Sequence, residues 1–185
     1  MKKLKFYLGI CACLVLLSCA SKPYMIGRNT INTVGLEQLN LVRADYQILK
    51  TVTATAVLTC KVTSSGLKIT EQNDEFELLV SGSVATVTKG ILKFGYLTND
   101  IGTTSALQST TGLVKQSQIA SYIPSDPETI ARQLAKYRLI NEAKALEGDG
   151  VIEPLISSDI TQTEKGVTVI KTTLTAKVIV LKTDK

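Results

Sequence analysis

Two stretches of the chain alternate between apolar and polar residues, the pattern of a β-strand with one buried and one wet face. In residues 46–63 the even positions are almost all apolar, whereas most odd positions are threonine. Residues 167–182 repeat the pattern, with Ile170, Leu174, Ala176, Val178 and Val180 on one face and Lys171, Thr173, Thr175 and Lys177 on the other. Residues 178–181 are apolar on both faces. We therefore expect the end of this strand to be central in a sheet or covered on both sides.

Shorter apolar stretches separated by turn residues predict further strands. Residues 67–70 follow Ser64-Ser65-Gly66 and are expected to pair back on the long strand. Residues 76–88 and 91–96 predict two strands joined by a hairpin turn at Lys89–Gly90. Residues 151–156 predict a strand in which Pro154 favours an edge or a bulge, because proline cannot donate to a ladder.

One helix has a clear start signal. Asp126 is the expected N-cap, Pro127 suits the first helical position and Glu128 faces the positive end of the helix dipole. The helix is expected to run to about Glu147, with Gly148 as its left-handed stop. Its apolar residues form two stripes, one of Ile130, Leu134 and Tyr137 and one of Ala131, Ala135, Leu139, Ala143 and Leu146. One stripe can pack on the sheet, so the second requires another cover.

These elements predict one α+β domain over residues 41–185, an antiparallel sheet of long strands packed with one main helix, in the order strands, helix, hairpin. Residues 98–125 show no clear periodicity and are rich in Ser, Thr, Gln and Gly. A connection of this length is either a functional loop or a surface excursion. The second helix stripe is expected to be covered by this connection, by residues before the domain or by another subunit.

The N-terminus carries a targeting pattern. Three lysines within residues 1–5 precede an apolar run of twelve residues, 6–17, which is too short to span a bilayer. We therefore expect residues 1–18 to be a cleaved secretory signal peptide and residues 19–40 to be a tether. Leu16-Leu17-Ser18-Cys19 resembles the bacterial lipobox. The resemblance implies that Cys19 becomes a lipidated first residue, whose diacylglyceryl and amide-linked acyl chains, such as palmitate, anchor the protein stably to a membrane.

The residues after Cys19 bear on location within the envelope. Ala20 and Ser21 stand where an aspartate would, by the rule for such lipoproteins, favour the inner membrane, and no acidic run of the surface-export type follows. The lipobox resemblance therefore implies an outer membrane lipoprotein that faces the periplasm. Loss of the signal peptide would lower the 21 basic residues to 18 against 16 acidic ones, a net charge of +2. This balance does not favour nucleic-acid binding.

Composition also restricts the chemistry. The chain has no histidine, which excludes a Ser-His-Asp triad, a Cys-His dyad and any imidazole metal site. Of its four cysteines, two lie in the expected signal peptide and Cys19 is the expected lipidation site, so Cys60 is left without an intramolecular disulfide partner. Cys60 shares the apolar parity of its strand, which favours core packing over a reactive thiol.

The remaining candidates for chemistry are carboxylates. The cluster from Glu71 to Glu75 is interpreted as a solvated loop rather than a calcium site, because it lacks the spacing of an EF-hand. The pairs Glu71 and Asp74, and Asp126 and Glu128, are possible acid–base groups, but nothing in the sequence places either pair across a cleft. Asp149, between two glycines, is interpreted as a turn residue rather than a contact in a site. No catalytic residue, metal or cofactor is therefore predicted.

Residues 141–153 carry a family resemblance. The run resembles one found in small bacterial envelope lipoproteins and in a small family often labelled heavy-metal-binding, with matches at Gly148, Asp149, Val151 and Ile152 and a glycine, Gly150, where alanine is usual. The general layout is similar to small envelope lipoproteins of Bacteroidetes type. The resemblance implies a fold and a location, not an activity. The metal label does not transfer, since the chain has no histidine and one remaining thiol.

Together these features predict a lipid-anchored, non-enzymatic envelope protein that works by self-association or by docking to another envelope component. The expected contact surfaces are a sheet edge beside Pro154 and the second helix stripe. The alternative is a small-ligand or glycan-binding lipoprotein, in which residues 98–125 close over a pocket lined by Tyr96 and Tyr122.

Overall fold

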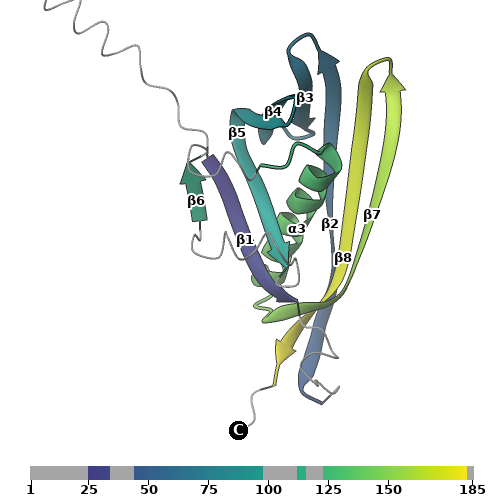
Figure 1. The fold of residues 1–185 in the computed structure, drawn as a ribbon. Coiled ribbons are helices and arrows are strands. Elements are labelled where there is room, and N and C mark those ends of the chain that lie inside the picture. Colours follow the sequence, from purple (N-terminus) through teal and green to yellow (C-terminus); the bar gives the residue numbers. More distant parts are fainter. Residues whose placement is uncertain (1–24, 34–43, 98–111, 116–122, 183–185) are drawn as a thin grey trace, which may run out of the picture.

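The computed structural model describes residues 25–33, 44–97, 112–115 and 123–182. Six of its strands form an antiparallel sheet in the order β5–β4–β3–β2–β8–β7, and the helix α3 (Pro127–Ala145) packs against the sheet (Figure 1). The strands are β2 (Tyr46–Thr63), β3 (Gly66–Glu71), β4 (Phe76–Ser81), β5 (Val84–Leu97), β7 (Gly150–Glu164) and β8 (Val167–Leu181). The predicted α+β fold, an antiparallel sheet with one helix, is confirmed for the described residues.

Two further strands join this sheet at its edges. β1 (Met25–Thr33) pairs in parallel with β5 and, at Asn32 and Thr33, in parallel with the start of β7, so it connects the two edge strands of the six. β6 (Gly112–Lys115) pairs antiparallel with β1. Residues 25–33 lie inside the range predicted as a tether, 19–40, and their pairing corrects that prediction for this stretch. The rest of the predicted tether lies outside the described residues.

The two alternating stretches form neighbouring strands, β2 and β8. The even residues of β2 from Val52 to Cys60 are buried, and on the other face the Oγ1 atoms of Thr53 and Thr175 lie 3.0 Å apart. The register shifts between Ile48 and Lys50, which leaves Leu49 as the extra residue of a bulge. At the end of β8, Val178 packs in the main core and Ile179 packs with Tyr46 and Ile152 in a second cluster. Val178 and Ile179 are therefore covered on opposite faces, as the sequence predicts, whereas Leu181 at the very end of β8 is 40% exposed.

The helix lies inside the curve of the sheet, between β5 and the β2–β8 pair (Figure 1). Both apolar stripes are buried apart from Tyr137 and Leu146, which are partly buried, and Leu134 of the first stripe and Leu139 of the second are each at 0% exposure. A Cβ on Gly95 of β5 would lie 2.0 Å from the backbone nitrogen of Tyr137, so only glycine permits this approach of strand and helix. The second stripe is covered by strands of the same chain, and the expectation that it forms a contact surface is wrong.

The start of the helix follows its sequence signal. The Asp126 side chain accepts hydrogen bonds from the Thr129 backbone N–H at 2.8 Å and from the Thr129 hydroxyl at 2.6 Å, and Pro127 occupies the first turn. Glu128 forms an ion pair of 2.5 Å with Arg132 one turn later. Asp126 thus satisfies an N–H group that the helix itself leaves unpaired.

The end of the helix differs from prediction by one residue. Glu147, not Gly148, takes the left-handed conformation, with φ of 56°. The N–H of Glu147 donates to the Lys144 carbonyl and the N–H of Gly148 donates to the Ala143 carbonyl, both at 3.0 Å, which is a Schellman motif. Gly148 is needed for another reason, since a Cβ there would lie 2.3 Å from Cγ1 of Val178. The glycine lets the helix end pack closely on β8.

The hairpin turn predicted at Lys89–Gly90 is also wrong. The β4–β5 hairpin turns at Gly82 and Ser83, and β5 continues through Gly90 to Leu97. Gly90 has φ of +76°, and a Cβ there would lie 2.0 Å from the Glu75 carbonyl oxygen. The glycine serves a close backbone approach next to the register shift between Glu77 and Leu78.

Candidate functional site

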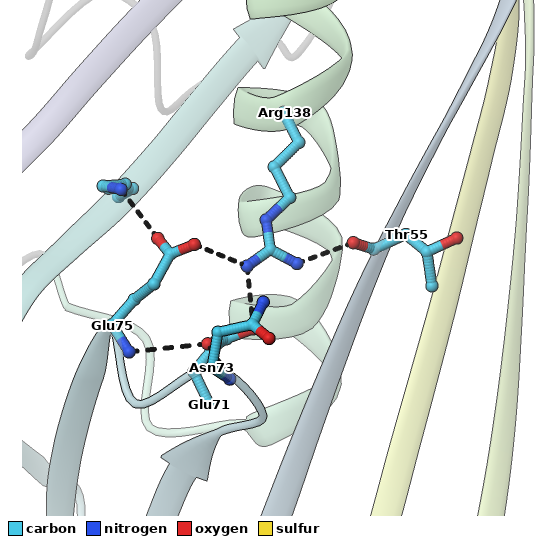
Figure 2. Close-up of polar contacts among 6 residues, drawn as sticks. Thr55, Glu71, Asn73, Glu75 and Arg138 are labelled. Carbon is cyan, nitrogen blue, oxygen red and sulfur yellow. Dashed lines mark hydrogen bonds and ion pairs between the residues drawn. The ribbon is translucent and has the colours of Figure 1, made fainter.

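A buried ion-pair network joins the helix to the sheet. Nη2 of Arg138 donates to Oε1 of Glu71 at 2.7 Å and to Oε1 of Glu75 at 2.9 Å (Figure 2). Nη1 of Arg138 donates to the Thr55 carbonyl on β2 at 2.7 Å. The Glu71 side chain is 0% exposed, so its charge depends on these protein partners.

The two carboxylates of this network flank the β3–β4 turn, with Glu71 at the end of β3 and Glu75 just before β4. Glu71 accepts a bond of 2.6 Å from the Asn73 backbone N–H, and its carbonyl accepts one of 3.0 Å from the Asp74 N–H, with Asp74 at φ of 56°. Gln72, Asn73 and Asp74 are exposed, but Glu71 is buried and Glu75 is partly buried. The interpretation of this cluster as a solvated loop is therefore wrong for Glu71, whose carboxylate points into the fold and not to solvent.

The charges of the network are mutually stabilising. Burial alone would raise the pKa of Glu75, but hydrogen bonds from Lys93 and Arg138 hold that pKa below its ordinary value. Burial alone would lower the pKa of Arg138, but its hydrogen bonds to Glu71 and Glu75 hold that pKa above its ordinary value. Lys93, on β5, lies 2.7 Å from Glu75 and 5.8 Å from the centre of the Tyr137 ring. The network thus links β2, the β3–β4 turn, β5 and α3.

Cationic side chains of the same chain engage the inward carboxylates of the Glu71–Glu75 cluster. Its two inward carboxylates already accept from Arg138, and Glu75 accepts from Lys93 as well. Within the described ranges, no group of three or more His, Cys, Asp or Glu residues is arranged to hold a metal ion. The other carboxylate pair suggested by the sequence, Asp126 and Glu128, is occupied by the helix cap and by Arg132.

Cys60 and Asp149 lie in local structural roles. Cys60 is buried in the main core, where burial and, to a lesser extent, the charge of Asp126 raise the pKa of its thiol to about 11. Its thiol is therefore protonated at neutral pH. Asp149 accepts a bond of 2.8 Å from the Leu181 backbone N–H, and its own N–H donates to the Ile179 carbonyl at 2.9 Å. This residue fastens the turn after the helix to the end of β8.

The predicted ligand pocket and the lipidation site lie largely beyond what the structure describes. Tyr96 is described and is buried in the core, in an edge-to-face contact with Phe94 at 6.3 Å between ring centres. Tyr122 and most of residues 98–125 lie outside the described residues, as does Cys19. The pocket of the alternative function and the acylation of Cys19 stay predictions from the sequence.

The strongest candidate for a contact surface is the free edge of β7, here defined as residues 155–164. Beyond Val151, β7 pairs only with β8 among the described residues, and it lies outermost in the sheet (Figure 1). At its start the register shifts between Ile152 and Leu155, with Glu153 at φ of 52°, which confirms the bulge or edge position predicted from Pro154. An open edge of this length presents unpaired backbone donors and acceptors to another strand.

Large apolar side chains are exposed along this β7 edge. Ile156 and Ile160 are 43% and 58% exposed, and they pair across the ladder with the buried residues Leu174 and Ile170. They therefore lie on the inner face of the sheet and continue the rows of the core beyond the region that the helix covers. Leu155, on the outer face of the sheet opposite Thr175, is 73% exposed. Apolar side chains beside an unpaired edge are typical of a protein interaction site.

Comparison with known proteins identifies no similar protein. No family model, no curated protein and no solved structure matches the chain. Among the described residues, no helix is long and apolar enough to cross a membrane.

Proposed function

We propose that this protein is a non-enzymatic, lipid-anchored component of the cell envelope that acts by binding another protein chain along the β7 edge. The observation that carries the proposal is the combination of an edge left unpaired by the described part of the chain with the exposed side chains of Ile156 and Ile160. A partner strand added there would satisfy the free backbone groups and cover both isoleucines. The same edge, beside Pro154, is a contact surface predicted from the sequence.

The second part of the proposal is the cellular location of the protein. It is supported by the apolar run of residues 6–17 and by the lipobox resemblance of Leu16-Leu17-Ser18-Cys19. Acylation of Cys19 would hold the domain at the outer membrane, facing the periplasm. We also propose that the domain is built of long strands in the order strands, helix, hairpin.

The non-enzymatic part rests on the side chains available for chemistry. The sequence has no histidine, its buried thiol has a raised pKa, and its most buried carboxylate is held by Arg138. The alternative, a small-ligand or glycan binder that uses residues 98–125, has no support from the described residues. It would gain support if the β7 edge proved dispensable.

The test uses the full-length chain expressed in a diderm bacterial host. Metabolic labelling with a palmitate analogue should mark the wild-type chain and not Cys19→Ser, and Cys19→Ser should leave the membrane fraction. Amine-reactive crosslinking of intact cells should then give an adduct that Ile160→Lys removes.

Val84→Lys is the matched control for Ile160→Lys. Val84 is 59% exposed, close to the 58% of Ile160, and lies on β5 at the opposite end of the strand order. The control should keep the adduct. Loss of the adduct in both variants, or in neither, would contradict a role for the β7 edge, and labelling of Cys19→Ser would contradict the lipidated address.

A further inference from the structure

Two exposed apolar residues of the β7 edge, Ile156 and Ile160, are arranged symmetrically about Ser158. Ile156 precedes Ser158 by two positions and Ile160 follows it by two, so all three share the inner face of the strand. Ser158 itself is partly buried, and its Oγ lies 3.0 Å from Oγ1 of Thr172 on β8. A strand with this spacing can match a second copy of itself running antiparallel.

From this symmetry we infer that the occupant of the β7 edge is a second copy of this chain, paired antiparallel through β7 with a two-fold axis at Ser158. In that register Ile156 lies opposite the partner's Ile160, and the reverse contact is identical, as an isologous interface requires. The inference rests on the proposed function and deepens it, because it names the partner.

The paired edges would continue the rows of the existing sheet. On the inner face of each copy, one row runs Ala54, Leu174, Ile156 and another runs Leu58, Ile170, Ile160. In the dimer, the Ile156 row of one copy meets the Ile160 row of the other. Two continuous apolar rows then cross the interface on either side of a hydroxyl row formed by Thr172 and Ser158. Cross-strand pairs of β-branched residues of this kind stabilise antiparallel sheets.

Charge and the matching of apolar residues favour this register over its two neighbours. An axis at Asp159 would place that carboxylate opposite its own copy, and like charges directly opposite are destabilising. An axis at Ser157 would place Ile160 opposite the partner's Pro154 and Ile156 opposite the partner's Ser158. With the axis at Ser158, Asp159 lies opposite the partner's Ser157, whose hydroxyl can donate to it.

The proposed lipid anchor would favour dimerisation through this small interface. Pairing from Leu155 to Thr161 is short compared with a standard protein interface. Anchoring two copies on one membrane replaces their concentration in solution by a higher effective concentration in the plane of the membrane. Association is therefore expected for the anchored, full-length chain.

The experiment is disulfide trapping in membranes of the host that expresses the full-length chain. Ser158→Cys places two thiols across the axis, where opposite Cα atoms of an antiparallel pair lie about 4.5–5.5 Å apart, within reach of a disulfide. Thr161→Cys is the matched control, because its two copies would be offset by six residues, about 20 Å. A dimer at position 158 and not at 161 or in the wild-type chain is the expected result.

Second-site variants test the register itself. In the Ser158→Cys chain, Ile160→Lys should abolish trapping and Val84→Lys should not. Ser157→Lys places a lysine opposite the partner's Asp159, and the two-fold symmetry creates this pair twice. This variant should raise the fraction of trapped dimer under limiting oxidant about fivefold, and Ser157→Asp should lower that fraction. Protease resistance of each variant checks that the domain is folded.

The outcomes separate this inference from the proposed function. No trapping at position 158, equal trapping at 158 and 161, or equal effects of Ser157→Lys and Ser157→Asp would overturn pairing with a second copy. If an adduct to a different protein still depended on Ile160, only the inference would fail. If neither trapping nor an adduct depended on Ile160, the proposed function would fail with it.

Discussion

Replacement of Arg138 by methionine should destabilise the domain far more than the same change at Arg132 on the same helix. Methionine keeps much of the length and apolar contact of the arginine stem but removes the guanidinium. At position 138 this change removes the hydrogen bonds to Glu71, Glu75 and the Thr55 carbonyl. At position 132 it removes an exposed pair with Glu128, in which the Arg132 side chain is 49% exposed.

The magnitude follows from the burial of each partner. Glu71, fully buried, loses a charge-assisted bond worth about 2–3 kcal/mol but keeps its bond from the Asn73 N–H. The Thr55 carbonyl loses a bond worth about 1 kcal/mol, whereas Glu75 is about a quarter exposed and keeps Lys93, so its loss is small. The total is about 3–4 kcal/mol for Arg138→Met, against about 0.3–0.5 kcal/mol for Arg132→Met.

The assay is urea unfolding followed by circular dichroism, with residues 21–185 of each variant compared with the wild type. At a slope of about 2 kcal/mol per molar urea, Arg138→Met should lower the midpoint by about 1.5–2 M, and Arg132→Met should leave it nearly unchanged. Adding Glu71→Gln to Arg138→Met should cost less than it costs in the wild type, because its partner is already gone. Midpoints of the two arginine variants within about 0.3 M of each other would refute the view that the network stabilises the fold.

Three other predictions concern single residues. Glu147→Gly should raise the free energy of unfolding by about 1 kcal/mol, because glycine adopts the left-handed conformation at the helix end without strain. Gly148→Ala should lower the free energy of unfolding, because its Cβ would clash with Val178. Unchanged melting temperatures of both variants would contradict the packing described at this end. The Cys60 thiol, with a pKa of about 11, should not react with a disulfide reagent at pH 8 until urea unfolds the domain, and rapid labelling of the folded chain would disprove its burial. The pKa of Glu75 is depressed in the folded state, so its paired carboxylate stabilises the fold above a pH of about 4.3. This contribution is lost as the pH falls through the depressed pKa. Glu75→Gln should therefore flatten the fall in melting temperature between pH 5 and 3, and an equally steep fall in this variant would argue against the stabilising role of Glu75.

The sequence predicts those elements whose signals are local. The alternation of β2 and β8 follows from one buried face, and the start of α3 follows from the contacts of Asp126 within its own first turn. Pro154 likewise marks the bulge that begins the β7 edge. In each case the residues that carry the signal are also those that make the structure.

The sequence does not predict features that depend on distant partners. The burial of Glu71 depends on Arg138, 67 positions later, and no local pattern links the two residues. Gly90 has the appearance of a turn residue, but its role is set by the Glu75 carbonyl that it approaches. Both helix stripes are covered because the sheet curves around α3, which packs on β2, β5 and β8, and no local pattern in the sequence indicates this curvature.

The pairing of β2 with β8 has a consequence for how the domain forms. Thr53 pairs with Thr175, 122 positions later, and Asn32 of β1 pairs with Gly150, so the first strands find their partners among the last. Contacts between such distant positions carry a large loop-closure cost, which slows folding. A chain that emerges N-terminus first from a ribosome or a translocation channel therefore lacks its central strand pair until residues beyond Val167 have appeared. The domain then folds as a completed chain rather than in stages during its synthesis or transport.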